Sequence, residues 1–343
     1  MTEVASTPSR PQRSGRPTLK DVAAQAGVAF KTVSRVVNGE PGVSPATREL
    51  VQGVIDELGF RRNVSAASLR QGQTATIALV IEDIAEPIQS ALARTVERAA
   101  VARHTLLFTA SSSDDETRER DLVQSLCARP VDGLILLPNE DGHRYLQAEI
   151  DSGVVVVAID RPIDGVAVDT VLSDNRQGAR EGVAHLINQG HRRIVFLGDE
   201  RMVFTASERF AGYHQALTEA GIPLDPTLEI LGQHDPDEVR VALDHVCSLP
   251  APPTAVFTAN SLNSLALLRA VGANHGLAHV AFDDLDLFDL LTPPITAVAQ
   301  DPAELGRIAS EMLFDRISGF DEPPRTAVVP TRLIVRGPSG AAR

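Results

Sequence analysis

From residue 76 onward, short runs of Val, Ile and other apolar residues alternate with longer stretches of helical spacing, and this alternation constrains the fold most. The runs lack polar alternation, which is typical of parallel strands that helices cover on both faces. We expect strands at Ile77–Ile81, Thr105–Ala110, Gly133–Leu137, Val154–Asp160, Ile194–Gly198, Ala255–Thr258, Val280–Phe282 and Thr296–Ala299. We expect helices at Ala91–Arg103, Glu116–Ala128, Gln177–Asn188, Arg209–Ala220, Asp237–Cys247, Asn263–Val271 and Pro302–Ile317. Because about 260 residues of this pattern exceed one ordinary sheet, two α/β lobes are predicted.

The residues before this region follow a different pattern. Residues 1–17 are rich in Ser, Thr, Pro and Arg without periodicity, which indicates a disordered tail. Residues 18–62 predict three short helices: Leu19–Ala26, Phe30–Val37 and Pro45–Leu58. Thr18 with Asp21 forms the pattern of a capping box, and Gly27 ends the first helix. Ser44 before a proline caps the third helix, whose apolar face is expected to hold Leu50, Val54 and Leu58.

The charge of the chain is unevenly distributed. Residues 1–76 hold ten basic and six acidic residues, a net charge of +4, while the whole chain carries −13. The remaining 267 residues therefore carry −17, from 22 basic and 39 acidic side chains. A basic head on an acidic body predicts that only the head meets a polyanion.

Two helices joined through Gly27, with a third packed behind them, are the plan of a helix-turn-helix. The inward face of the second helix is apolar, with Val33, Val36 and Val37. Its outward face carries Phe30, Lys31, Ser34 and Arg35. Arginine can bond a guanine edge with two hydrogen bonds, and an aromatic edge can touch a thymine methyl group. A small helical bundle whose charges are merely solvated fits the same pattern, so these residues alone leave both interpretations open.

The segment from Thr18 to Asn38, TLKDVAAQAGVAFKTVSRVVN, resembles the opening of the LacI/GalR family of bacterial transcription repressors. Val43–Arg48 and Leu58–Asn63 continue the match, and the resemblance covers about residues 18–340. One departure is Ala29, where the family usually has a serine that caps the recognition helix. The resemblance implies a helix-turn-helix head and a body like that of a periplasmic sugar-binding protein of type I.

The resemblance also implies where DNA is bound, with a palindromic double-stranded operator and a homodimer as the expected assembly. In the head it places DNA contacts at Thr18, Phe30, Lys31, Thr32, Ser34, Arg35 and Asn38. In the hinge helix and linker, residues 63–75, it places them at Asn63, Ser65, Ala66 and Leu69. Leu69 matches the family's leucine that enters the minor groove, where an apolar wedge kinks the duplex. Without the resemblance, a plain linker is the simpler interpretation of this segment.

For residues 76–340 the resemblance implies an effector-binding and dimerisation domain in which the chain crosses between the lobes three times. Lobe one is expected at about 76–172 and 301–330, and lobe two at about 173–300 and 331–340. Facing α/β lobes form a cleft at the ends of their strands, which is a natural ligand site. The family's ligand-contacting positions fall on Ile88, Asp160, Arg209, His234, Asn260, Asp283 and Gln300.

These side chains suit the vicinal hydroxyls of a carbohydrate, because Arg donates, Asp accepts and the amides do both. A structural ion pair between Arg209 and Asp283 is the alternative. The chain also departs from the family at this site. Glu86-Pro87-Ile88 stands where the family commonly has Asn-Pro-Phe, and Asn260-Ser261 stands where it often has Asn-Asp. His234 falls near the position of an aromatic that stacks on a ligand ring in several members.

Other classes of protein fit less well. There is no phosphate-binding glycine motif after a strand, no nucleophile elbow and no metal-spaced His/Cys set, so no enzymatic activity, cofactor or metal is expected. Two cysteines, Cys127 and Cys247, are too few for a disulfide scaffold or zinc site. Without an apolar run of membrane length or a secretory signal, a cytoplasmic location is expected. The sequence therefore predicts an effector-controlled DNA-binding transcriptional repressor; the alternative is a solute-binding or metabolic α/β protein that does not bind DNA.

Overall fold

The computed structural model describes residues 17–60, 74–139 and 142–337. The chain divides into two compact units between residues 72 and 73. The first unit contains three helices among its described residues: α1 (Leu19–Ala26), α2 (Phe30–Val37) and α3 (Pro45–Leu58). The capping box at Thr18 is present, and Gly27 adopts a φ of +64°, a left-handed conformation that glycine reaches without strain. This confirms the expected helix-turn-helix plan.

The core of this unit is a small cluster of valines and one alanine, shared by the three helices. Val33 and Val36 are buried on α2 as predicted. The expected apolar face of α3 is partly wrong, because Leu50 is 52% exposed and Val51 is buried in its place. The buried face of α3 is thus shifted by one residue from the predicted face. Val51 and Val54 lie about one turn apart on the same side of the helix and both point inward.

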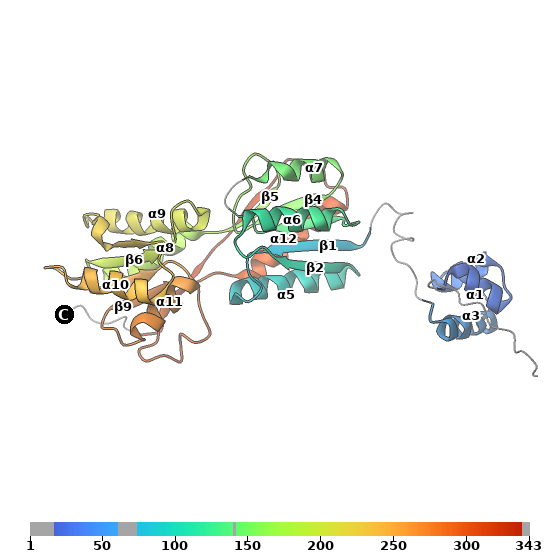
Figure 1. Ribbon diagram of the computed structural model, residues 1–343, viewed down its shortest axis with the longest axis horizontal. Coiled ribbons are helices and arrows are strands. Elements are labelled where there is room, and N and C mark those ends of the chain that lie inside the picture. The colour runs from blue at the N-terminus through green and yellow to red at the C-terminus, as the bar shows by residue number, and fades with distance from the viewer. Residues whose placement is uncertain (1–16, 61–73, 140–141, 338–343) are drawn as a thin grey trace, which may run out of the picture. The chain divides into compact units, whose positions relative to one another are not determined.

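The second unit contains two lobes, each built on a six-stranded sheet (Figure 1). In lobe one the strand order is β11-β5-β4-β3-β1-β2, and all neighbours pair in parallel. The strands are β1 (Thr76–Ile81), β2 (Leu106–Ser111), β3 (Gly133–Leu136), β4 (Val155–Ile159), β5 (Asp169–Ser173) and β11 (Thr326–Val329).

Helices cover both faces of this sheet. On one face lie α5 (Pro87–Ala102) and α12 (Pro302–Ile317), against Ile77, Leu79 and Ile81 of β1. On the other lie α6 (Glu116–Cys127) and α7 (Leu146–Asp151), against Ala78 and Val80, after a short 3-10 turn η1 (His143–Tyr145). Successive residues of β1 are thus buried on opposite faces, which explains its unbroken apolar run.

In lobe two the strand order is β12-β10-β9-β8-β6-β7, and only the β10–β12 pair is antiparallel. The strands are β6 (Ile194–Gly198), β7 (Glu229–Leu231), β8 (Ala255–Thr258), β9 (Ala278–Phe282), β10 (Thr296–Ala299) and β12 (Arg332–Ile334). The helices are α8 (Asn175–Asn188), α9 (Phe204–Glu219), α10 (Pro236–Cys247) and α11 (Ser261–Val271), with a 3-10 turn η2 (Pro226–Leu228). Gly212 allows α9 to approach α8 closely, since a Cβ there would collide with the Arg176 carbonyl.

Both lobes are α/β layers on parallel sheets, apart from the antiparallel edge strand β12, which confirms the predicted fold class. Four strands were not predicted, namely β5, β7, β11 and β12. Strand β5 was missed because its first residue, Asp169, is a buried carboxylate that Arg316 and Arg325 neutralise. The chain passes between the lobes three times, after β5, after β10 and after β11. Among the described residues, no helix is both long and apolar enough to cross a membrane.

Candidate functional site

The first candidate site is the outer face of α2. Phe30 and Lys31 are exposed at its first turn, and Thr32 and Ser34 are half-buried. Ala29 at the N-cap makes no side-chain hydrogen bond, as expected from the missing serine. This face therefore presents an aromatic ring and a cation to solvent at the N-terminal end of a helix, where DNA-reading side chains sit in helix-turn-helix proteins.

The later part of the same face holds a loose polar cluster around Glu40. Arg35 is partly exposed, and its Nε lies 3.8 Å from a Glu40 carboxylate oxygen. Asn38 donates to the other Glu40 oxygen at 3.3 Å and to the Ser34 hydroxyl at 3.5 Å. Long contacts in solvent are weak, so these side chains can turn to another partner at little cost.

Two groups of expected DNA contacts remain. Thr18 is exposed, and its hydroxyl donates to Asp21 at 2.7 Å within the capping box. The expected hinge contacts Asn63, Ser65, Ala66 and Leu69 lie outside the described residues.

The second candidate site is a cavity of about 550 Å³ between the two lobes of the body. Its volume falls in the range of roughly 300–1,000 Å³ that is usual for small-molecule sites. The structure brings all seven expected effector positions to its lining: Ile88, Asp160, Arg209, His234, Asn260, Asp283 and Gln300. Each of the seven comes from a different helix or loop, so the fold, not the local sequence, assembles them.

Arg209 and Asp283 are the two buried members of this set, and Arg209 is 5% exposed. Its Nε donates to the Asn175 side chain and its terminal nitrogen to the Ala259 carbonyl, both at 2.7 Å. The guanidinium also lies 3.7 Å from an Asp283 carboxylate oxygen and 3.9 Å from the centre of the Phe282 ring. The expectation that Arg209 opens its helix is wrong, because α9 begins at Phe204.

Asp283 and Asp160 directly follow the last residues of β9 and β4, and both have left-handed backbones, with φ of +71° and +69°. That conformation is uncommon outside glycine, although Asp tolerates it better than most residues. Asp283 is buried, and it accepts hydrogen bonds from Gln300 at 2.7 Å and from the Ser261 backbone at 3.2 Å. Both carboxylates thus lie at carboxyl ends of strands, where ligands of α/β sheets bind.

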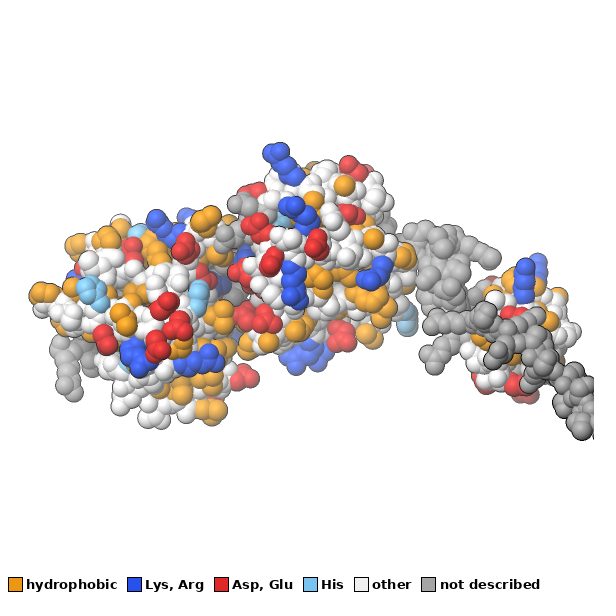
Figure 2. Space-filling view, viewed as in Figure 1, with side chains coloured by type: hydrophobic (Ala, Val, Ile, Leu, Met, Phe, Trp, Pro, Cys, Tyr) orange, Lys and Arg blue, Asp and Glu red, His pale blue; other side chains and the backbone are white. Residues whose placement is uncertain are grey.

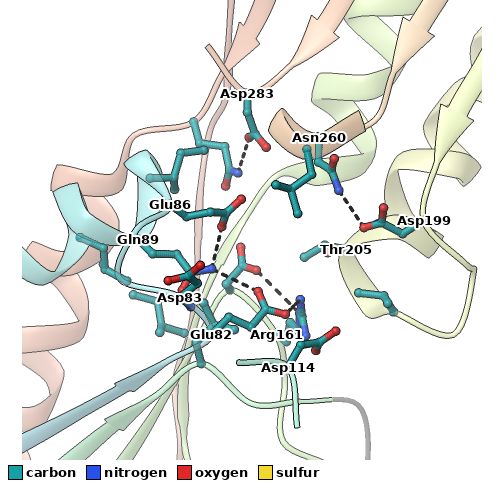
Figure 3. Close-up of a pocket in the computed structure, with 18 of the residues that line it drawn as sticks. Glu82, Asp83, Glu86, Gln89, Asp114, Arg161, Asp199, Thr205, Asn260 and Asp283 are labelled. Carbon is teal, nitrogen blue, oxygen red and sulfur yellow. Dashed lines mark hydrogen bonds and ion pairs between the residues drawn. The ribbon is translucent and has the colours of Figure 1, made fainter. Parts of the chain in front are cut away.

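Asn260 lies at the N-cap of α11 and serves two purposes. Its side-chain oxygen accepts from the Asn263 backbone at 2.8 Å, and its nitrogen donates to Asp199 at 2.7 Å (Figure 3). His234 stands 3.5 Å from the other Asp199 oxygen and is half exposed. His234 therefore reaches the cavity as part of a polar chain with Asp199 and Asn260.

Sequence reasoning missed much of the lobe-one wall, which is acidic (Figure 3). Glu82 pairs with Arg161 at 2.8 Å. Glu86 accepts from Gln89 at 2.7 Å and, across the cleft, from the Ser261 hydroxyl at 2.9 Å. The missed residues Glu82 and Asp199 each follow a predicted strand directly, so applying the strand-end rule to every strand would have found them.

Burial in the cleft raises the pKa of two carboxyl groups that line it, those of Glu86 and Asp160. Burial raises the pKa of Glu86; the hydrogen bond from Ser261 opposes this, and the nearby Asp283 carboxylate raises the pKa further. Burial likewise raises the pKa of Asp160, against the opposing charges of Arg161 and Arg209. In the space-filling view, acidic side chains are visible on both lobes beside their junction (Figure 2). Among the described residues, no cluster of His, Cys, Asp or Glu is arranged to hold a metal ion.

Comparisons with known proteins give the chain's relatives. Residues 18–63 match the family model described as bacterial regulatory proteins, lacI family, and residues 183–339 match the periplasmic binding protein-like domain. The chain is 36% identical to the HTH-type transcriptional regulator CelR of Thermobifida fusca, over 95% of this chain and 99% of that protein.

Two solved structures extend the comparison. A CelR–cellobiose complex is 35% identical, with a TM-score of 0.69, and the match covers 95% of this chain and 100% of that one. The lac repressor dimer bound to operator and the anti-inducer ONPF is 25% identical, with a TM-score of 0.78, over 95% and 99% of the two chains. These matches run through both the helix-turn-helix unit and the two-lobed unit.

Proposed function

Since this chain belongs to the lacI family of bacterial regulatory proteins and is a DNA-binding transcriptional regulator, we propose that it represses transcription as a homodimer on a palindromic operator. A carbohydrate bound between the lobes changes its operator affinity. The observation that carries this proposal is the joining of a helix-turn-helix with a two-lobed cavity lined by all seven expected effector residues. The protein acts in the cytoplasm and has no enzymatic activity of its own.

The DNA-binding part of the proposal assigns residues 18–62 to major-groove recognition and residues 63–75 to the hinge. Arg35 reads a base edge, while Lys31, Ser34 and Thr18 contact phosphates. Asn63, Ser65, Ala66 and Leu69 contact the minor groove, with Leu69 as the wedge. The exposure of Phe30 and Lys31 and the loose pairing of Arg35 support the assignment in the head.

The effector part assigns residues 76–340 to ligand binding and dimerisation. Arg209, Asn260 and Asp283 supply donors and acceptors for vicinal hydroxyls, and the cellobiose in the CelR structure is a ligand of that kind. Dimerisation is supported by exposed apolar side chains on the edge of lobe one. Val101 near the end of α5 and Leu106 and Phe108 on β2 are all exposed.

The coupling between the sites follows from the hinged body. Three chain crossings join the lobes, so a ligand that contacts both walls favours one lobe arrangement. It changes operator affinity only if it binds the two arrangements unequally. A coupling of 1–3 kcal/mol, or roughly 5- to 150-fold in operator affinity, is the usual size of such an effect.

Selection from a library of random-sequence duplexes, followed by gel mobility shift, tests the DNA-binding proposal. We expect enrichment of a palindrome and a retarded complex that a carbohydrate weakens or strengthens. A solute-binding or metabolic protein without DNA binding would enrich no sequence. If a palindrome is bound but no member of a carbohydrate panel changes its affinity, the effector class is wrong while the DNA-binding function stands.

A further inference from the structure

The lining of the cleft contains far more carboxylates than cations. Eight acidic side chains line it: Glu82, Asp83, Glu86, Asp114, Asp160, Asp199, Glu200 and Asp283. Within the described part of the chain, two guanidinium groups line it, those of Arg161 and Arg209. The imbalance constrains the charge of whatever binds there, because a charged wall enclosed in protein is screened less than one in bulk solvent.

The positive charge of each guanidinium is already balanced by a carboxylate of the protein. Arg161 is held by Glu82 at 2.8 Å and by the Pro138 carbonyl at 3.3 Å. Arg209 donates to Asn175 and Ala259 and faces Asp283. A phosphate or carboxylate would have to displace these partners while also approaching the surrounding carboxylates. The cleft therefore disfavours sugar phosphates and organic acids.

The carboxylates, in contrast, have capacity left to accept hydrogen bonds. Glu86 accepts only from neutral groups in the described structure, namely Gln89 and Ser261. Its Oε1 faces lobe two across the cleft, where the Ser261 hydroxyl reaches it at 2.9 Å. An ionised carboxylate accepts and never donates, so a ligand at this wall must donate. An ammonium group brings three donors and the opposite charge.

A second observation, which does not depend on the acidic side chains, also points to a ligand in the cleft. Thr205, near the start of α9, is 6% exposed and lines the cavity (Figure 3). No hydrogen bond joins its side chain to another described residue. Buried polar groups are nearly always paired, so this hydroxyl is satisfied by an occupant of the cleft or by water. It faces the acidic wall from the opposite lobe, as a partner for a hydroxyl of the same ligand.

The electrostatics of Glu86 agree with a cationic occupant. Burial and the neighbouring Asp283 and Glu82 carboxylates raise the pKa of Glu86, despite its two hydrogen bonds. An ammonium group beside it would lower that pKa again, because it favours the charged form. Binding of a cation thus removes a repulsion that the ligand-free cleft contains.

We propose that the effector is a carbohydrate that carries a protonated amine, and that Glu86 receives its ammonium group. The inference rests on the proposed carbohydrate effector and narrows its class. The rest of the ligand lies against Arg209, Asn260 and Asp283, while Glu86 selects the charged substituent from the opposite wall. The residue that departs from the family's usual asparagine is then the residue that sets selectivity.

Three β-1,4-linked disaccharides with one skeleton test this proposal: cellobiose, the corresponding glucosamine disaccharide and its N-acetylated form. They differ only in carrying a hydroxyl, an ammonium or an acetamide group on each ring. Their dissociation constants for the full-length protein are measured by titration calorimetry at a pH where the amine is protonated. We expect the glucosamine disaccharide to bind at least about tenfold more tightly than the other two, because charged hydrogen bonds are stronger than neutral ones.

Two variants locate the effect. Glu86→Gln keeps the shape and the Ser261 contact but removes the charge, and we expect it to lose the preference for the amine while still binding cellobiose. Glu97→Gln removes a charge from the exposed side of the same helix, outside the cavity lining, and should behave as wild type. A preference that persists in Glu86→Gln would overturn the assignment of this residue.

The same titrations distinguish a failure of the amine-bearing ligand from a failure of the carbohydrate proposal. Equal or tighter binding of cellobiose would overturn the inference of a cationic ligand and leave the carbohydrate proposal standing. Absence of binding by all three disaccharides, in protein that still binds its operator, would overturn the inference of an amine-bearing ligand. The carbohydrate proposal would fall as well if no member of the wider carbohydrate panel changed operator affinity.

Discussion

The recognition helix α2 and the effector cleft are both binding surfaces, but their side chains are held in opposite ways. On α2 the candidate contacts are exposed or joined by long, weak contacts, as between Arg35 and Glu40 at 3.8 Å. In the cleft the central contacts, Arg209 and Asp283, are buried and already paired, as Arg209 is with Asn175 at 2.7 Å. A surface of the first kind can bind without changing the protein. A ligand in the second must replace or join internal partners, which is how its binding can change the arrangement of the lobes.

The largest effect is expected at Arg209. Removing one partner of a buried ion pair costs roughly 3–5 kcal/mol, because the other charge is left unpaired. Arg209→Ala should therefore lower the free energy of unfolding by about that amount and abolish the effector response, while operator binding persists in the folded protein. Denaturant unfolding and mobility shift measure the two effects.

The matched control for this variant is Arg176→Ala. Arg176 forms a more exposed pair with Glu208 on the neighbouring helices α8 and α9, and such pairs contribute at most about 1 kcal/mol. If Arg209→Ala unfolds, Asp283→Asn keeps the shape and tolerates the left-handed backbone, and it should weaken the effector response about tenfold or more. Wild-type effector response in both cleft variants would place the ligand elsewhere.

The next effect is expected on α2. Arg35→Ala should weaken operator binding by about 1–3 kcal/mol and affect binding to random-sequence DNA less, because a base contact is lost. The free energy of unfolding should hardly change, since the Arg35–Glu40 contact is long and solvated. Equal losses on operator and random DNA would show that Arg35 contacts phosphate only.

A smaller effect is expected at the start of the same helix. Ala29 leaves the N-cap of α2 without a side-chain hydrogen bond. Ala29→Ser should stabilise the first unit by about 1 kcal/mol. Ser44→Ala, which removes the existing cap of α3, should destabilise it by a similar amount and serves as the reciprocal control. Thermal unfolding of both variants that leaves the midpoint unchanged would contradict the capping argument.

The smallest effect is a pH dependence at Glu86. Its pKa is raised in the folded protein, so the ionised form at neutral pH costs stability relative to the protonated form. At a pH below the ordinary carboxyl pKa, Glu86 is protonated in both the folded and the unfolded chain, and this cost is absent. The cost develops as the pH rises through the pKa that Glu86 has in the folded protein. Ligand-free Glu86→Gln should therefore be slightly more stable than wild type at neutral pH, and the difference should fade on acidification. A difference that grows on acidification would contradict the sign.

The same contrast explains what the sequence could predict. The helices of the head and the faces of α2 follow from capping residues and valine spacing, which are local signals. Buried strands such as β1 follow from their apolar runs. Strand β5 could not be predicted in this way, because it begins with the buried carboxylate of Asp169. The arginines that pair with this carboxylate lie about 150 residues away in sequence, and no local pattern reveals them.

The residues of the candidate cleft also fall into those that the sequence could predict and those that it could not. Arg209, Asn260 and Asp283 were found through their family motifs. Glu86 was noticed only as a departure, since its contact with Ser261 joins residues 175 positions apart. Thr205 gave no signal, because a threonine near a helix start has nothing in its sequence to show that its hydroxyl faces a cavity.

The most direct test of the central claim, that one ligand bound to both walls of the cleft controls the protein, is amide hydrogen exchange on the full-length chain with its tightest-binding carbohydrate. We expect protection in both lobes, in residues 82–89 of lobe one and in residues 199–209 and 259–264 of lobe two. Without operator, the exchange of α2 should not change, because its side chains do not take part in the cleft. Protection confined to a single lobe, or lying outside these segments, would contradict the claim.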